Sequence, residues 1–377
     1  MNQEDAQHKG RVSDEELARL RAKIGQRVHI AEPPYLSEVT RDACRHWAWA
    51  TGDKNPLFVD EDYAKKSIHG KLLSPPCMLY GFDRMSIGYR GGLPGVHSMF
   101  GGSWWKWHQP ITLGEKITTE VTFKGLEEFP SRFAERMFKQ ISEIKFLGTD
   151  GTELANSHSW GMRTERTKAK EKAKYKELEQ TQFTVDEIKD IASIYKKEVC
   201  RGAIPLYYED VDLEQDIPEI IRGPYSATIA VAFEQAWGGL FIWAHGYWFD
   251  FISRHPAAGI LNKNQVPEPP EAVHWDSELA KSVGVPDAYD YGPERISWIA
   301  TMLTNWIGDD GFLEELYVEI RRFNLLGDLT YCLGKVIEKE PVLNGKGRVK
   351  LQVLAKDQRG QVTAKGWAKV LLLSKHH

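Results

Sequence analysis

The sequence lacks any apolar run long enough to cross a membrane, since stretches such as 238–243 fall far short of the roughly 20 residues required. It has only four cysteines, Cys44, Cys77, Cys200 and Cys332, without C-x-x-C spacing or the density of a disulfide framework. It also lacks excess positive charge, because 49 basic against 53 acidic residues give a net charge of −4. We therefore expect a cytoplasmic protein with reduced thiols and with neither a nucleic-acid nor a membrane partner.

Several catalytic motifs are missing too. The glycine-rich stretch 91–95 lacks the Gly-Lys-Ser/Thr ending of a phosphate-binding loop. No G-x-S-x-G elbow of a serine hydrolase occurs, and no histidine pair has the H-E-x-x-H spacing of a zinc site. These absences predict a protein without a metal or nucleotide cofactor.

A chain of 377 residues is long enough for two domains. A strongly charged run at 163–177 interrupts the apolar periodicity and is typical of a solvated linker or exposed helix. We predict an N-terminal domain at 1–165, a charged linker with a short helix at 166–204, and a C-terminal domain at 205–377. The last domain carries an insertion at about 240–270.

Each predicted domain places a helix before a run of strands. In the first half, Thr40 caps a helix that Gly52 ends, and alternating strands follow from Gly102. In the second half, Thr228 caps a helix that ends at Gly238-Gly239, and alternating strands follow from Leu313. An earlier helix begins at Ser13, with Glu16 completing a capping box, and reaches Ile24.

The two halves also repeat short motifs. Leu113-Gly114-Glu115 corresponds to 326–328, and Phe58-Val59-Asp60 with Ala64 corresponds to 274–276 with Ala280. A period this long indicates duplicated domains rather than a solenoid. A helix followed by antiparallel strands predicts a sheet wrapped around a central helix. Two such units would share one continuous sheet, which is the α+β tandem, or double, hot-dog fold.

Residues 51–60, Thr-Gly-Asp-Lys-Asn-Pro-Leu-Phe-Val-Asp, resemble the hydratase motif G-D-x-N-P-L-H-x-D of MaoC-like (R)-specific enoyl-CoA hydratases. Residues 74–76, Ser-Pro-Pro, look like the G-x-x-A-P-P segment of fused family members. In the second half, residues 273–276, Val-His-Trp-Asp, resemble the N-P-I-H-W-D segment of acyl-thioester dehydratases. Together the resemblance covers about residues 30–165 and 205–375.

The resemblance implies a lyase that hydrates a 2-enoyl-CoA or dehydrates a 3-hydroxyacyl-CoA. This chemistry needs a carboxylate, an imidazole and a backbone N–H that stabilises the thioester oxygen. In this chain the motif is split between the halves. The first half keeps Asp53 and Asn55 but has Phe58 at the histidine position, and the second half keeps His274 but has lost the aspartate.

Residues near the second-half motif are candidates for the missing groups. Asp250 and His255 lie in the aromatic-rich insertion and are candidate partners for His274. Tyr291-Gly292 occupies the place of the family's A-H-G segment, so the resemblance gives Gly292 the oxyanion role and Tyr291 a possible acid or hydrogen-bonding role. Arg295 is a candidate for binding a phosphate or substrate carboxylate. Asp53 equally fits a turn cap, and Asp250, His255 and Tyr291 equally fit structural roles.

The leading hypothesis is an acyl-thioester hydro-lyase with its site in the second half, acting on a bulky or branched acyl group. Two alternatives stay open. One is an acyl-CoA thioesterase that uses Asp53, and the other is a non-catalytic acyl-thioester binding subunit. The substrate would be carried as a CoA thioester with no further cofactor. Since hot-dog pairs often associate further, we also expect a homodimer.

Overall fold

The computed structural model describes residues 12–29, 32–89, 91–93, 96–130, 136–164, 181–239, 242–256 and 258–376. Its longer helices are α2 (Asp14–Arg21), α3 (Arg41–Thr51), α7 (Val185–Lys197), α8 (Ala227–Trp237), α9 (His245–Arg254) and α11 (Gly292–Ile307). Its short ones are α4 (Pro56–Val59), α5 (Glu61–Ala64), α10 (Ser277–Ser282) and the 3-10 helices η1 (Pro76–Phe82), η2 (Tyr208–Asp210) and η3 (Pro270–His274). In these ranges we find no helix both long enough and apolar enough to span a membrane.

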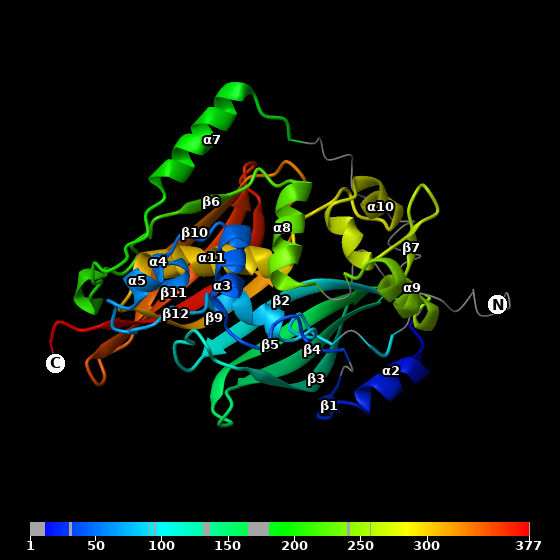
Figure 1. The fold of residues 1–377 in the computed structure, drawn as a ribbon, viewed down its shortest axis with the longest axis horizontal. Coiled ribbons are helices and arrows are strands. Elements are labelled where there is room, and N and C mark those ends of the chain that lie inside the picture. The colour runs from blue at the N-terminus through cyan, green and yellow to red at the C-terminus, as the bar shows by residue number, and fades with distance from the viewer. Residues whose placement is uncertain are drawn as a thin grey trace.

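A ten-stranded antiparallel sheet dominates the fold (Figure 1). The first-half strands are β1 (Arg27–Val28), β2 (His97–Trp107), β3 (Thr118–Pro130), β4 (Arg136–Leu147) and β5 (Glu153–Thr164). The second-half strands are β6 (Ile220–Arg222), β9 (Phe312–Ile320), β10 (Thr330–Lys339), β11 (Lys346–Asp357) and β12 (Val362–Leu373). A separate hairpin, β7 (Ile260–Leu261) with β8 (Pro267–Glu268), lies in the insertion.

The strand order relates the two halves by a pseudo-twofold axis. The order is β1-β3-β4-β5-β2-β9-β12-β11-β10-β6, so each strand of one half has its counterpart at the mirrored position of the other. The halves join where β2 pairs with β9, in a register that sets Gly102 opposite Glu319 and Lys106 opposite Glu315. The continuous sheet predicted for a double hot dog is therefore present.

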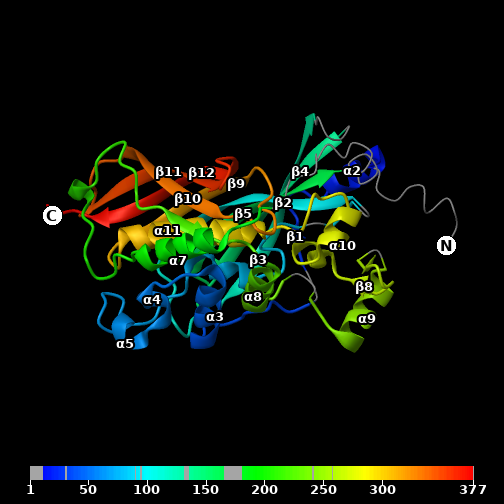
Figure 2. The same cartoon turned by 90° about the horizontal axis from the view of Figure 1, so that it is seen from above.

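The helices form two layers on one face of the sheet. Helix α11 packs directly on the sheet, and α3 and α8 pack against each other beyond it (Figure 2). Aromatic contacts join these layers, because Phe233 of α8 contacts both Trp47 of α3, at 5.5 Å between ring centroids, and Tyr291 at the start of α11. The outer pair thus closes the core from the side opposite the sheet.

The assignment of the central helices differs from the sequence-based expectation. That reading put the helices that begin after Thr40 and Thr228 at the centre, whereas the structure puts α11 against the second-half strands and the short η1 near the first-half strands. Every residue of α11 from Pro293 to Ile307 is buried. A helix buried on all sides shows no amphipathic stripe, so the helical period was not visible there.

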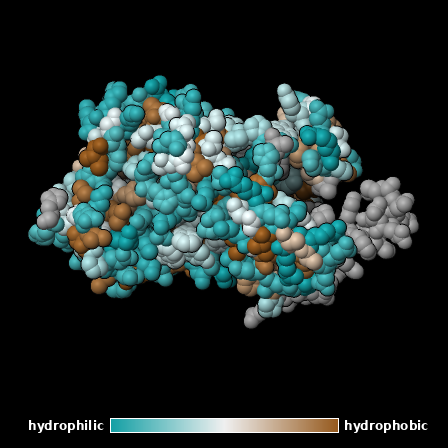
Figure 3. All heavy atoms as spheres, turned by 90° about the horizontal axis from the view of Figure 1, so that it is seen from below, coloured by the Kyte–Doolittle hydropathy of each residue, from teal (hydrophilic) through white to brown (hydrophobic). Residues whose placement is uncertain are grey.

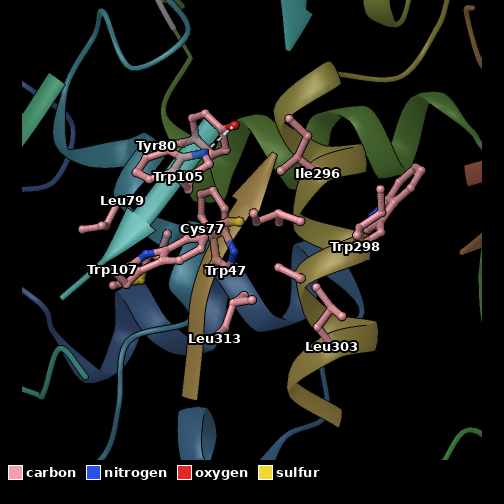
Figure 4. Packing of buried hydrophobic residues seen from close by; sticks show 14 of the residues in the cluster. Trp47, Cys77, Leu79, Tyr80, Trp105, Trp107, Ile296, Trp298, Leu303 and Leu313 are labelled. Carbon is pink, nitrogen blue, oxygen red and sulfur yellow. Dashed lines mark hydrogen bonds between the residues drawn. The ribbon is translucent and has the colours of Figure 1, made fainter. Parts of the chain in front are cut away.

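The main core is rich in tryptophan (Figure 4). Trp105 and Trp107 of β2 stack with centroids 5.7 Å apart, and Trp105 also meets Tyr80 of η1 edge-on. Trp298 adds a further buried indole from α11. Such rings bury large apolar areas and lock the sheet to the helices with defined geometry.

The repeated motifs occupy equivalent places in the two halves. Asp60 caps α5 and Asp276 caps α10, each with a side chain that accepts from a backbone N–H three residues later. Gly114 and Gly327 both have positive φ in the turns before β3 and β10. The internal repeat read from the sequence therefore reflects a duplicated structure.

Other helices predicted from the sequence are present in the structure, but the residues at which they begin or end differ. Helix α2 has its capping box at Ser13 but ends at Arg21 instead of Ile24. Helix α8 is capped by Ser226, two residues before the predicted cap, Thr228. The short helix predicted within the linker is α7, while most of the charged run at 163–177 lies outside the described residues. On the face in Figure 3 hydrophilic residues predominate and apolar ones are scattered.

Candidate active site

The first-half motif forms a tight, buried turn after α3. Asp53 is 6% exposed, and its Oδ1 accepts from the backbone N–H of Asn55 at 2.9 Å while its Oδ2 accepts from the Thr301 hydroxyl at 3.0 Å. Burial raises the pKa of Asp53. Asn55 in turn caps α4 by accepting from the N–H of Leu57. Both polar side chains are therefore engaged in holding the turn.

A pocket beside this turn is walled by Phe58, at the position where the family motif has histidine. Asn55 lines the pocket, but Asp53 does not. The replacement of an imidazole by a phenyl ring removes the proton-transfer group from this position of the motif. The first-half motif thus keeps its structural residues without an acid–base pair.

The second-half candidates meet at the start of α11. Gly292 is the first residue of this helix and Tyr291 is its N-cap, and no side chain caps the helix start. The ring of His274 lies on that of Tyr291 with centroids 3.7 Å apart. His274 Nδ1 lies 2.7 Å from the backbone oxygen of Tyr289, so Nδ1 donates and the lone pair of the neutral ring is on Nε2.

The structure adds a carboxylate that the sequence-based reading missed. Glu234, in the last turn of α8, is 7% exposed and lies beside the hydroxyl of Tyr291. Gly239 stands where Asp53 stands in the first half, two residues beyond the end of its helix. A Cβ at Gly239 would lie 2.2 Å from Glu234 Oε2. The carboxylate of Glu234 therefore fills the space that a side chain at the motif's aspartate position would occupy.

The surroundings of Glu234 favour its neutral form. Burial, followed by the nearby charge of Glu271, raises the pKa of Glu234 to about 8. The hydroxyl of Tyr291 is close enough to Glu234 to lower the pKa of this carboxyl, and it offsets only part of the effect of burial. A buried carboxyl whose pKa is raised toward neutrality, beside the tyrosine whose ring contacts His274, has the properties of a general acid–base group.

One sequence signal could have identified Glu234. The dipeptide Gly238-Gly239 leaves no side chain at the aspartate position, and Glu234 is the only acidic residue within the preceding helix. A glutamate one turn back has a longer side chain that can reach the same place. The sequence instead predicts that a residue of the insertion replaces the motif's aspartate, because the insertion lies between Gly239 and His274 in the sequence.

The two candidate residues of the insertion do not contact His274 in the described part of the chain. Asp250 and His255 are both exposed on or next to α9. His255 Nδ1 contacts the backbone oxygen of Phe251, and the backbone oxygen of Asp250 accepts from Ser253. Trp248 and Phe251 bury their rings against each other, which makes the aromatic run a small local core.

Arg295 is a structural residue rather than a ligand-binding one, which corrects the expectation from its position. It is 1% exposed and pairs with the buried Asp290 through both ends of its guanidinium. Its Nη1 also donates to the backbone oxygens of Arg322 and Thr363. This arrangement anchors the start of α11 to the loops at the end of the sheet.

We expect Arg295→Leu to lower the free energy of unfolding by about 3–5 kcal/mol, because it leaves Asp290 as an uncompensated buried charge. Urea denaturation measures this loss. The double variant Asp290→Asn/Arg295→Leu, which removes both charges, should recover part of it. A variant of unchanged stability with a raised KM would instead return Arg295 to a ligand-binding role.

A large cleft opens beside the start of α11, with about 2460 Å³ of empty space including its open mouth. Phe100 and Phe323 line it. Phe100 packs against Gly292, and Phe323 meets Tyr289 edge-on at 4.6 Å. One layer of aromatic side chains thus separates the cleft from the His274 region.

All four cysteines are free thiols. Burial raises the pKa of Cys44, Cys77 and Cys332 to about 12, which makes them poor nucleophiles at neutral pH. Within the part of the chain that the structure describes, we find no cluster of His, Cys, Asp and Glu suited to a metal ion.

In comparisons with known proteins, the chain is similar to hydratases and dehydratases that act on thioesters of CoA or resemble such enzymes in fold. A family model described as the FAS1-like dehydratase domain region matches residues 23–131. The chain is 31% identical over 74 residues to an (R)-specific enoyl-CoA hydratase from Rhodospirillum rubrum, covering 20% of this chain and 50% of that enzyme. It is 30% identical over 79 residues to the alpha subunit of a 3-oxo-4,17-pregnadiene-20-carboxyl-CoA hydratase from Mycobacterium tuberculosis, covering 20% of this chain and 24% of that subunit. The chain thus matches only part of each relative.

Solved structures extend the likeness over the whole fold. A MaoC-like dehydratase superposes with a TM-score of 0.65 at 18% identity, covering 94% of this chain and 100% of the other. A conserved protein from Mycobacterium tuberculosis with a double hot-dog fold superposes with a TM-score of 0.54 at 12% identity, covering 93% and 96%. The chain therefore has the double hot-dog fold, and part of its sequence is similar to an (R)-specific enoyl-CoA hydratase and to the FAS1-like dehydratase region.

Proposed function

We propose that the chain is an acyl-thioester hydratase or dehydratase whose active site is formed by Glu234, His274 and Gly292 at the start of α11. One observation carries the proposal. The carboxylate of Glu234 takes the place of the motif's missing aspartate, and the same Tyr291 ring contacts the retained histidine. The two halves of the split motif therefore need not combine across the molecule.

Hydration of a 2-enoyl thioester can be written with these groups alone. Nε2 of His274 takes a proton from water as the water oxygen bonds to C3 of the substrate. The protonated carboxyl of Glu234 gives its proton to C2, and the electron pair of the double bond forms the new C–H bond. The N–H of Gly292, at the positive end of α11, stabilises the thioester oxygen while it carries negative charge. Dehydration reverses each transfer.

The cleft beside Gly292 supports a bulky or branched acyl group. The cleft is wide and open, and Phe100 and Phe323 provide apolar walls. We propose that the thioester enters from this cleft and that Phe100 moves aside. The chemistry requires no metal or organic cofactor beyond the thioester carrier. A cytoplasmic location and a homodimer stay predictions.

The alternatives have less support. A thioesterase that uses Asp53 would need that carboxylate to face substrate, yet both of its oxygens are bonded within the turn. A binding subunit without activity would have no need for a buried carboxyl with a pKa of about 8. An assay against a panel of enoyl-CoA thioesters separates the three. Loss of enoyl absorbance without free thiol supports the hydratase, and thiol release supports the thioesterase. Thermal stabilisation by acyl-CoA without turnover supports the binding subunit.

A further inference from the structure

The pocket at the other end of α11 is a separate feature of the molecule. It is lined by residues of both halves, including Asn55, Trp107 and Asp309, and it is partly open to solvent. Asp309 lies 17 residues beyond Gly292, which corresponds to about 25 Å along a helix. The pocket therefore cannot be part of the site at His274.

Its lining is mostly apolar with acceptor groups at one side. Leu57, Phe58, Leu73, Ile111 and Phe312 are among the apolar residues that line it. None of its described lining residues is a lysine or an arginine. An anionic ligand such as a phosphate or a carboxylate would therefore have no counter-charge here, and it would lose its hydration.

Asp309 is the polar residue that the surrounding structure leaves incompletely bonded. It is 4% exposed, and its Oδ2 accepts from the Tyr63 hydroxyl at 2.7 Å. Its Oδ1 has no hydrogen-bond partner among the described residues, although it is buried. A buried carboxylate oxygen without a donor costs about 1–3 kcal/mol or more, so such a group calls for an explanation.

His69 fixes the backbone at the same place. Its Nε2 lies 2.9 Å from the backbone oxygen of Asp309, and its ring lines the pocket. The N–H of Asp309 donates to the backbone oxygen of Gly202 at 3.0 Å. These contacts fix the backbone of Asp309 beside the apolar cavity that this residue lines.

We propose that this pocket is a second ligand site, which takes a compact apolar molecule bearing a hydroxyl group that donates to Asp309 Oδ1. The apolar body replaces water against Phe58, Trp107 and Phe312. Phe58 thus has a function in the first half, as a wall of a binding pocket where the family motif would have its histidine. The site does not depend on the proposed hydratase activity.

Three molecules of matched shape test this proposal: benzyl alcohol, ethylbenzene and benzylammonium. An apolar cavity alone would favour ethylbenzene strongly, because benzyl alcohol loses the hydration of its hydroxyl. We expect benzyl alcohol to bind at least as tightly as ethylbenzene, measured by titration calorimetry. In Asp309→Leu, of similar size, benzyl alcohol should bind about tenfold more weakly or worse, while ethylbenzene is unaffected.

Hydrogen exchange of the unaltered protein provides a second readout that needs no variant to fold. Benzyl alcohol should protect a peptide covering 308–313 and leave one covering 291–296 unchanged. His274→Ala should bind benzyl alcohol as the unaltered protein does, so failure here is separable from failure of the hydratase proposal. Tighter binding of ethylbenzene or of benzylammonium, or no protection at 308–313, would overturn the proposal.

Discussion

Glu234→Gln is expected to lower kcat/KM for hydration of an enoyl thioester by about 10²- to 10⁴-fold, the range typical of losing a general acid. The amide has nearly the size of the carboxyl but no proton to give to C2. Because the fold is preserved, KM should change little while kcat falls. Absorbance of the conjugated enoyl group measures the rate directly.

Asp53→Asn is the matched control for this substitution. It makes the same change from carboxyl to amide at the equivalent place in the other half, where the side chain bonds Asn55 and Thr301. We expect activity to stay within a few-fold of the unaltered protein. Equal losses in the two variants, or a loss confined to Asp53→Asn, would place the chemistry at the first-half motif instead.

The free energy of unfolding should fall with rising pH between about pH 4.5 and 8 because of Glu234. In the unfolded chain this carboxyl ionises near its ordinary value of 4.5, whereas burial holds its folded pKa at about 8. Between these values the folded state binds one more proton than the unfolded state, so stability is lost as pH rises. The loss is on the order of 3–5 kcal/mol for this one group.

Urea denaturation of the unaltered protein and of Glu234→Gln at several pH values isolates this effect. The two should be similarly stable near pH 4.5, and the variant should become the more stable one by several kcal/mol above pH 8. A catalytic group whose removal stabilises the fold fits the trade-off between stability and activity. Stability curves that run parallel over this range would show that Glu234 ionises normally.

The same pKa predicts the pH dependence of the reaction. Hydration requires the protonated carboxyl, so kcat/KM should fall about tenfold per pH unit above pH 8. Dehydration requires the ionised carboxyl and should rise with pH up to the same value. In Glu234→Gln, the part of the pH dependence that this carboxyl causes should be absent from the kcat/KM profiles of both hydration and dehydration.

The sequence predicted the fold class and the order of its elements well, because most of them have one buried face. The alternation in β3 to β5 and the caps at Ser13 and Thr40 are local signals that the structure retains. Helix α11 went unrecognised because it is buried all round and shows no polar stripe. Which helix contacts the sheet depends on packing between distant segments, and a local pattern carries no such information.

The site was predictable in part for a similar reason. His274, Tyr291 and Gly292 could be named because they stand in recognisable segments, and the structure brings them together at one helix start, while their catalytic roles stay predictions. Glu234 was missed because it reaches its place from one turn before the motif position. Arg295 was predicted to bind an anionic ligand group, whereas in the structure it forms a buried ion pair with Asp290. The sequence alone does not reveal this burial.

The measurement that tests the central claim most directly compares the unaltered protein with His274→Ala on enoyl-CoA thioesters, with enoyl absorbance and free thiol followed together. We predict loss of the enoyl signal without thiol release, and a decrease of about 10²-fold or more in kcat/KM for the variant. Full activity in His274→Ala would contradict a site at the start of α11. Thiol release at the rate of enoyl loss would contradict a hydratase.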